Sequence, residues 1–243
     1  MTDRPRGNNE RVTAALNPRS ILNNFTVLTT NARSLKPKIH SLLDYFDELD
    51  IAVALISETW LKDNEETERL CTDAVHRKGV KIIAKHRPQK KNRRFVAGGR
   101  IAISYNTNKI TLKNYALCNN PFEIVAAVGK LPNIKRRNVT ISAYAPPRLN
   151  KSQMTGLVEF NASMIDKAKK DFDNPFIIIG GNFNQMQLDG IQERHAEVLM
   201  LQSAATRGSH TLDKILSNIT SWNTEVRQPL ESECGTRQSD HVL

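Results

Sequence analysis

The sequence predicts an α/β protein, a four-layer sandwich in which two packed mixed β-sheets are flanked by helices. Apolar, strand-like runs dominate the chain, and segments with helical spacing of apolar residues lie between them. Several of the strand-like runs end in polar side chains, as expected where loops build a site on a rigid base. With 243 residues, 39% of them hydrophobic, the chain can bury a substantial core.

The first regular segments predict a β-α-β unit. Residues 25–31 and 51–58 are apolar runs typical of strands, and each ends in a polar residue, Asn31 and Glu58. Between them, residues 37–49 show helical spacing of their apolar positions, which are Ile39, Leu42, Leu43, Phe46 and Leu49.

The remainder of the chain alternates strands with helices. Residues 61–79 are acidic and are expected to be irregular, and helices are expected at 151–170 and 191–203. Strands are expected at 81–86, 99–105, 122–130, 138–144, 175–184, 211–217 and 222–228, with the start of another at 239–243. Residues 1–21 are expected to form a flexible tail, and residues 22–243 one domain that is truncated in its last strand.

The charge favours a polyanionic partner. Lys and Arg total 35 against 25 Asp and Glu, a net charge of +10, which suits nucleic acid or an anionic membrane surface. A basic surface that serves only solubility is an equal alternative from charge alone. Basic residues gather at 85–94, expected to be an exposed hairpin loop, and at 135–137.

The sequence is expected to be that of an intracellular protein. No run approaches the roughly 18 apolar residues of a membrane helix, and residues 1–20 lack an apolar signal core. The three cysteines, Cys71, Cys118 and Cys234, lie far apart without a CxxC pair, so neither a zinc site nor a disulfide framework is expected.

Glu58 and Asn31 are candidate metal ligands. A carboxylate at the end of a buried strand is costly unless it is paired or binds a metal. Mg²⁺ takes one or two carboxylates, neutral oxygens and several waters. The alternative is that Glu58 ends its strand in solvent.

Three further segments carry candidate site residues. Tyr144 precedes a diproline that could hold its phenol towards a site, although it could equally be a half-buried aromatic. In Gly180-Gly181-Asn182-Phe183-Asn184, glycines allow close approach to a ligand and the two amides are expected on one side; a plain turn is the alternative. Asp240-His241 needs a second carboxylate to orient the His, and Asp213 is the candidate. By itself Asp213 fits a solvated charge on a strand edge.

Together, these segments resemble the endonuclease/exonuclease/phosphatase superfamily, which includes apurinic-site endonucleases and DNase I. They look closest to the endonuclease domain of LINE-type non-LTR retrotransposons. The matching pieces are NARSL (31–35), SETWL (57–61), GGR (98–100), SAYAPP (142–147), GGNFN (180–184), TLD (211–213) and SDH (239–241). They follow the family order and span residues 25–243, and the first two most suggest a retrotransposon.

The resemblance implies a DNase I-like fold and a role for each residue. Glu58 and Asn31, with Asp240, would hold Mg²⁺, for which Mn²⁺ could substitute. Tyr144 and Asn184 would position the scissile phosphate. Asp213 would orient His241, which would stabilise charge on the phosphoryl oxygens. The candidates for gripping DNA phosphates are Arg33, Lys90, Lys91, Arg93 and Arg94.

At position 182 the chain has Asn where the family has an Asp that activates or orients the attacking water. An amide can hydrogen-bond a water but cannot deprotonate it. The leading hypothesis is therefore a Mg²⁺-dependent endonuclease, acting on double-stranded DNA in the nucleus, whose nicking is impaired by Asn182. It would leave a 3′ hydroxyl for a reverse transcriptase domain of the parent polypeptide.

Three alternatives stay open. A catalytically inactive DNA-binding remnant is the first, because of Asn182. A phosphatase or phosphodiesterase of the same superfamily acting on another ester, such as a lipid or inositol phosphate, is the second. An unrelated α/β sandwich is the third. Salt-dependent DNA binding without cleavage would select the first.

Overall fold

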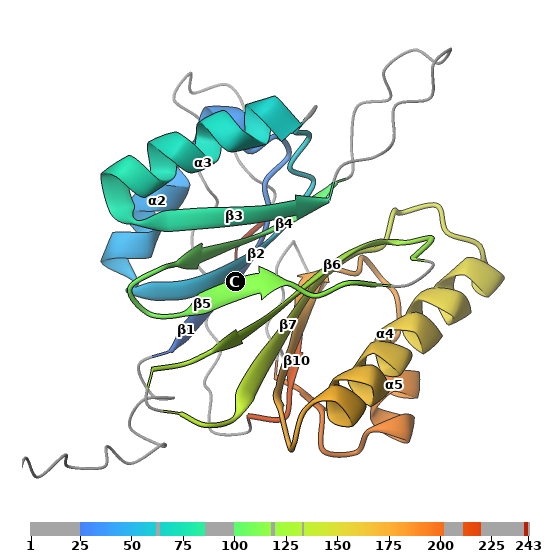
Figure 1. Ribbon diagram of the computed structural model, residues 1–243. Helices are drawn as coiled ribbons and strands as arrows, with labels where there is room; N and C mark the ends of the chain where they lie inside the picture. Colours follow the sequence, from blue (N-terminus) through green and yellow to red (C-terminus); the bar gives the residue numbers. More distant parts are fainter. Residues whose placement is uncertain are drawn as a thin grey trace, which may run out of the picture.

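Two β-sheets packed face to face form the centre of the protein (Figure 1). The computed structural model describes residues 25–61, 64–85, 100–117, 120–132, 134–201, 211–219 and 241–242. One sheet has five strands in the order β11-β1-β2-β4-β3, and the other has six in the order β5-β6-β7-β8-β10-β9.

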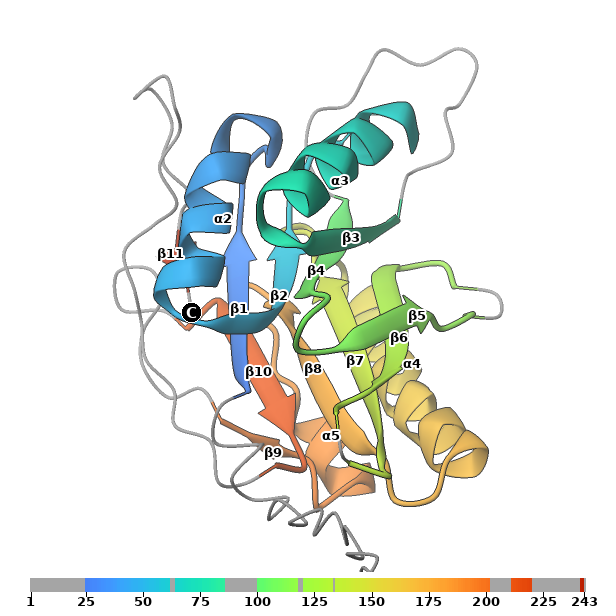
Figure 2. The ribbon, with the colours of Figure 1, turned by 60° about the vertical axis from the view of Figure 1, so that its left-hand side comes forward.

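The five-stranded sheet carries the N-terminal half of the fold. Its strands are β1 (Thr26–Asn31), β2 (Ile51–Ser57), β3 (Val80–Lys85), β4 (Ile101–Asn106) and β11 (His241–Val242). The 3-10 helix η1 (Lys36–Lys38) leads into α2 (Ile39–Glu48), and α3 (Asn64–Lys78) follows β2. Figures 1 and 2 show α2 and α3 side by side on the outer face of this sheet.

The six-stranded sheet carries the C-terminal half. Its strands are β5 (Thr111–Asn114), β6 (Glu123–Lys130), β7 (Arg137–Tyr144), β8 (Phe176–Asn182), β9 (Leu199–Met200) and β10 (Asp213–Ser217). Helices α4 (Lys151–Asp171) and α5 (Asp189–Arg194) cover its outer face (Figure 2). Asn150 starts α4 with a capping box, in which its side chain accepts from the Gln153 N–H and Gln153 accepts from the Asn150 N–H.

Three buried clusters correspond to the three junctions between layers. One joins α4 and α5 to the six-stranded sheet, one fills the space between the two sheets, and one joins α2 and α3 to the five-stranded sheet. The order of layers is therefore helices, sheet, sheet, helices, and the predicted four-layer sandwich is confirmed.

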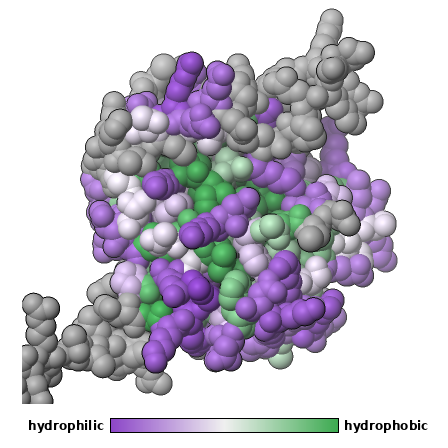
Figure 3. All heavy atoms as spheres, viewed as in Figure 1, coloured by the Kyte–Doolittle hydropathy of each residue, from purple (hydrophilic) through white to green (hydrophobic). Residues whose placement is uncertain are grey.

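One face of the protein is largely polar. Hydrophilic residues cover most of the face in Figure 3, and hydrophobic ones gather towards its middle. Among the described residues, Leu199 is the exposed large hydrophobic side chain. No helix in the described ranges is long and apolar enough to cross a membrane.

Two predictions about helices were wrong. Residues 61–79 contain the 15-residue helix α3, whose buried stripe consists only of Thr67, Leu70 and Ala74 among the described side chains. So narrow and partly polar a stripe gives little periodic signal. The helix expected at 191–203 ends at Arg194, and Leu199–Met200 instead pairs with β10.

Other differences are smaller. Strand β5 was not predicted, because only Leu112 of its four residues is buried. The tail at 1–21, the strand expected at 222–228 and most of the basic loop at 85–94 lie outside the described residues.

Candidate active site

Strand ends from both sheets meet at one edge of the sandwich. In the five-stranded sheet β1 runs parallel to β2 and Asn31 pairs with Ser57, so Asn31 lies beside Glu58. In the six-stranded sheet β7 runs parallel to β8 and Tyr144 pairs with Asn182. Strand β10 is antiparallel to β8, which brings its first residue, Asp213, opposite Asn182.

Glu58 joins the two sheets through its side chain. Its Oε1 accepts a hydrogen bond from Asn31 Nδ2 at 2.8 Å and another from the Tyr144 hydroxyl at 3.0 Å. Residues separated by 86 positions in sequence therefore meet on one carboxylate oxygen. Charge-assisted bonds of this kind are stronger than neutral ones and hold a carboxylate in one orientation.

The backbone around Glu58 is held in an unusual conformation. The chain after β1 is hydrogen-bonded to the chain after β2: Ser34 N donates to Glu58 O at 2.8 Å and Leu35 N to Thr59 O at 2.9 Å. Five non-glycine residues here have positive φ, namely Arg33 (42°), Ser34 (83°), Glu58 (51°), Trp60 (54°) and Arg100 (72°). Such conformations cost about 1–3 kcal/mol each and cluster at functional sites.

Asn182 and Asn184 are held differently from each other. Strand β8 ends at Asn182, and Asn184 lies beyond it with a φ of 50°. Strand alternation therefore does not extend to Asn184. Asn182 Oδ1 accepts from the Asn184 backbone N–H at 3.2 Å, while Asn184 Nδ2 donates to the Ala145 carbonyl at 2.6 Å. Asn184 is thus fixed against the turn that follows Tyr144.

Asp213 is fully buried, which excludes the solvated strand-edge alternative. Its strand lies between β8 and β9, although β9 pairs only with Leu216 and Ser217 at the far end of β10. His241 pairs through the backbone with Asn31, because β11 runs antiparallel to β1. Asp240, Lys90, Lys91, Arg93 and Arg94 lie outside the described residues.

Arg33 lies at the same edge of the sandwich, directly beyond β1. Its backbone N–H donates to Asn31 Oδ1 at 3.2 Å, and its side chain is half-buried. Arg33 therefore lies next to Asn31.

Lys38 is a residue that sequence reasoning missed. Its side chain is fully buried, and its ammonium donates to the carbonyls of Ala32 and, at 3.3 Å, Arg33. Lysine is almost never fully buried without partners. The ammonium holds the loop that follows Asn31. Its burial has no signal in the sequence beyond a basic residue before an apolar helix.

Lys38→Met is expected to destabilise the fold. The substitution removes the donor while keeping the length of the side chain, and leaves carbonyl groups without a partner at about 1–3 kcal/mol for each buried group. Urea unfolding of both proteins measures the loss. Lys36→Met, at an exposed position in the same 3-10 helix, is the control and is expected to change the free energy of unfolding by less than about 0.5 kcal/mol. Equal stability of the Lys38 variant and the parent would contradict the structural role.

The donor set around Glu58 fits a hard divalent cation. In the described ranges no three His, Cys, Asp or Glu side chains converge as a metal cluster. Mg²⁺ does not require one, since it binds through one or two carboxylates and completes its shell with water and substrate phosphate. The Glu58 carboxylate and the Asn31 amide oxygen, on adjacent strands, are the residues that would hold it.

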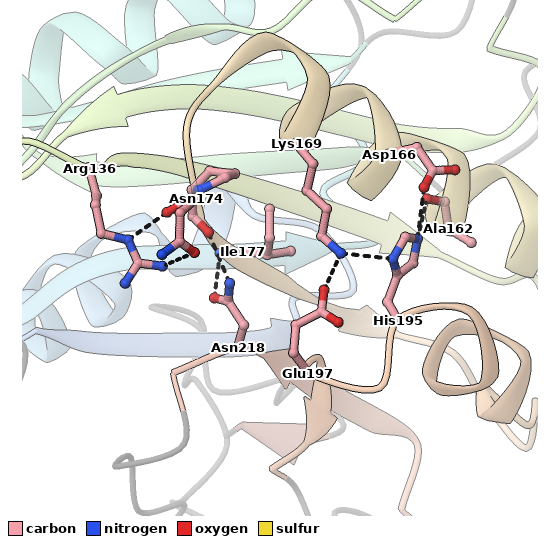
Figure 4. A network of polar contacts seen from close by, with 10 residues as sticks. Arg136, Ala162, Asp166, Lys169, Asn174, Ile177, His195, Glu197 and Asn218 are labelled. Atoms are coloured by element: carbon pink, nitrogen blue, oxygen red, sulfur yellow. Dashed lines mark hydrogen bonds and ion pairs between the residues drawn. The ribbon is translucent and has the colours of Figure 1, made fainter.

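A second polar network lies at the opposite end of the six-stranded sheet (Figure 4). Lys169 of α4 contacts His195 Nδ1 at 3.2 Å and forms an ion pair with Glu197. His195 Nε2 lies 3.0 Å from the Ala162 carbonyl, so the proton is assigned to Nε2. These contacts hold α4 against the segment after α5, away from the candidate active site.

Comparison with known proteins rests on structure. No protein-family model matches the sequence, and no curated protein sequence matches it significantly. Solved structures match over nearly the whole chain. One is the endonuclease domain of TRAS1, a telomere-specific non-LTR retrotransposon, with a TM-score of 0.60 and 15% identity over 90% of this chain and 96% of that one.

Two further solved structures match over a similar share of the chain. An AP endonuclease from Archaeoglobus fulgidus has a TM-score of 0.61 and 11% identity, covering 90% of this chain and 96% of that one. The 3′ phosphatase NExo from Neisseria, bound to a product DNA hairpin, has a TM-score of 0.57 and 14% identity, covering 89% of this chain and 96% of that one. The expected fold, that of the endonuclease/exonuclease/phosphatase superfamily, is therefore confirmed.

Proposed function

We propose that the protein is a Mg²⁺-dependent DNA endonuclease domain of a non-LTR retrotransposon, impaired by Asn182. It would hydrolyse one phosphodiester of duplex DNA and leave a 3′ hydroxyl for primed reverse transcription. The observation that carries this proposal is the Glu58 carboxylate, which Asn31 and Tyr144 orient from two different sheets.

Each site residue has a part in this chemistry. Glu58 and Asn31 would hold the metal, which when bound neutralises charge developing on the phosphoryl oxygens. The Tyr144 hydroxyl can donate to a phosphate oxygen, and Asn184, fixed beside it, can do the same. Asp213 would orient His241 as a further source of stabilisation.

Two observations support DNA as the substrate. The net charge of +10 favours a polyanion, and basic side chains bind phosphates by releasing counterions. Among the structural neighbours, TRAS1 is an endonuclease domain and NExo was bound to DNA. A reverse transcriptase in the same polypeptide is part of the proposal, and so is action in the nucleus.

Glu58→Gln is expected to abolish metal-dependent nicking. Loss of second-shell partners alone typically costs about 10–100-fold in metal affinity or activity, so loss of the ligand itself should cost at least about 100-fold. Nicking of supercoiled plasmid in Mg²⁺ is measured in the Asn182→Asp background, where activity is expected to be higher. Extension of the nicks by a DNA polymerase checks for the 3′ hydroxyl.

Glu159→Gln is the matched control, because Glu159 is exposed on α4 and its loss removes the same charge. In the Asn182→Asp background, Glu159→Gln should nick plasmid at the same rate as Asn182→Asp alone. Nicking that survives Glu58→Gln would contradict the proposal. Release of phosphate from a lipid or inositol phosphate, with no nicking, would instead support a phosphatase of the same superfamily.

Asn182 also favours a second candidate, a DNA-binding module without turnover. The amide stands where the proposed chemistry needs a carboxylate, while the oriented Glu58 is retained. Under this alternative the chain binds duplex DNA in a salt-dependent manner, and neither Mg²⁺ nor Mn²⁺ induces cleavage even after Asn182→Asp.

A further inference from the structure

Glu123 connects the two sheets at the edge that carries the candidate site. It is the first residue of β6, in the six-stranded sheet, and its Oε2 accepts a hydrogen bond from the Arg100 backbone N–H at 2.5 Å. Arg100 directly precedes β4 of the five-stranded sheet. The adjacent residue strengthens this connection, since Lys85 at the end of β3 donates to the Phe122 carbonyl at 2.7 Å. Burial lowers the pKa of Lys85 below its usual value.

From Arg100 the hydrogen bonding continues to the residue beside Glu58. The Arg100 carbonyl accepts from the Thr59 backbone N–H at 3.1 Å. Thr59 lies between Glu58 and Trp60, and both neighbours have positive φ, as has Arg100 itself. Non-glycine residues keep this conformation only where their surroundings determine it. Glu123 supplies an acceptor that stabilises the turn at Arg100.

Glu123 also lies beside Tyr144, the second residue that contacts Glu58. It pairs with Tyr144 across β6 and β7, and the Tyr144 hydroxyl donates to Glu58 Oε1 at 3.0 Å. The backbone of Glu58 is thus fixed through Thr59 and Arg100, and its side chain through Tyr144. Both sets of contacts involve Glu123, the first residue of β6.

We propose that Glu123 is a positioning residue that sets the orientation of Glu58 through the backbone of Arg100 and Thr59. This proposal rests on the proposed function, in which Glu58 is the metal ligand. Glu123 acts through the contact of its Oε2 with the Arg100 backbone N–H. Loss of that contact is expected to lower metal affinity without removing a ligand.

Two substitutions separate the length of the Glu123 side chain from its charge. Glu123→Gln loses the charge but keeps an oxygen at the same distance from the backbone, so it can still accept from Arg100. Glu123→Asp keeps the charge but is one methylene shorter, and its oxygens cannot reach the same point. Mn²⁺ binding, followed by the electron paramagnetic resonance of free Mn²⁺, is the first measurement. Hydrogen exchange of the Thr59 and Arg100 amides is the second.

We expect the Gln variant to bind Mn²⁺ as the parent does and the Asp variant to bind about tenfold more weakly, the loss typical of outer-shell partners. Exchange at Thr59 and Arg100 should accelerate only in the Asp variant. Weak binding by Gln with normal binding by Asp would overturn the proposal in favour of a charge effect. Parent-like affinity and exchange in both variants would overturn it as well.

Glu58→Gln distinguishes this failure from failure of the proposed function. If it binds Mn²⁺ as tightly as the parent, Glu58 is not the ligand and the proposed function fails. Exchange at Thr59 and Arg100 in the Asp variant then still decides whether Glu123 holds this turn. If Glu58→Gln loses binding and Glu123→Asp does not, the proposed function stands and the positioning role is overturned.

Discussion

Asn182→Asp is expected to increase Mg²⁺-dependent nicking of supercoiled plasmid by about 10²–10⁴-fold, the contribution of a positioned general base. The amide can hold a water in place but has no basic lone pair at neutral pH. A carboxylate at the same position can both orient the water and accept its proton. No other substitution in the chain is expected to raise activity as much.

The structure favours this substitution sterically. Asn182 is nearly fully buried at the end of β8, and its Oδ1 already accepts from the Asn184 N–H at 3.2 Å. An aspartate has the same shape and can accept the same bond. Its neighbours in the sheet are Tyr144 on one strand and the buried Asp213 on the other.

Asn150→Asp is the control, since it introduces the same charge at the N-cap of α4, where Asp caps as well as Asn. It should leave nicking unchanged. Plasmid nicking as a function of time, at fixed Mg²⁺ and pH, provides the comparison. If Asn182→Asp nicks no faster than the parent, the substitution at 182 is not what limits activity.

The parts of the site that could be predicted are those that follow from strand ends. Asn31 and Glu58 end apolar runs in a β-α-β unit, and parallel strands place their carboxyl ends at the same edge. Tyr144 and Asn182 lie together for the same reason. Predicting where these residues lie requires only the direction of each strand, and the alternation of apolar runs with helices indicates that direction.

The remaining parts depend on tertiary partners. Glu123 and Lys38 contact backbone groups of Arg100 and Ala32, and a backbone acceptor or donor leaves no trace in the sequence. Strand β9 forms because Met200 pairs with Leu216 of β10, and that pairing overrides the helical spacing of residues 191–203.

The two glycines of GGNFN are required for a different reason from the one expected from the sequence. Close approach to a ligand was expected, but the close approaches are to protein. A Cβ on Gly180 would lie 2.5 Å from Leu55 Cδ1 of the facing sheet, and one on Gly181 would lie 2.0 Å from the Ala143 carbonyl oxygen. Gly181 also has a φ of 138°, which side chains rarely adopt. These glycines determine how closely β8 packs, and therefore where Asn182 stands.

Gly181→Ala is expected to destabilise the protein by about 2–5 kcal/mol, from overpacking of a buried strand together with backbone strain. Unlike a contact with a flexible side chain, contact with the Ala143 carbonyl cannot be relieved by a rotamer change, so β7 and β8 must move apart. Urea unfolding measures the change in free energy. Gly156→Ala, on the helix α4 with its nearest contact at 3.2 Å to Phe122, is the control.

Helix propensity favours Gly156→Ala by up to about 1 kcal/mol, and the 3.2 Å approach to the Phe122 ring opposes this gain. Gly156→Ala should therefore change the unfolding midpoint far less than Gly181→Ala. Since Asn182 follows Gly181 directly, separation of β7 from β8 would also displace it from Tyr144. In the Asn182→Asp background, Gly181→Ala should therefore reduce nicking even at a temperature where the variant remains folded. A Gly181 variant as stable as the parent would show that β8 has room there and that this glycine does not set the position of the site.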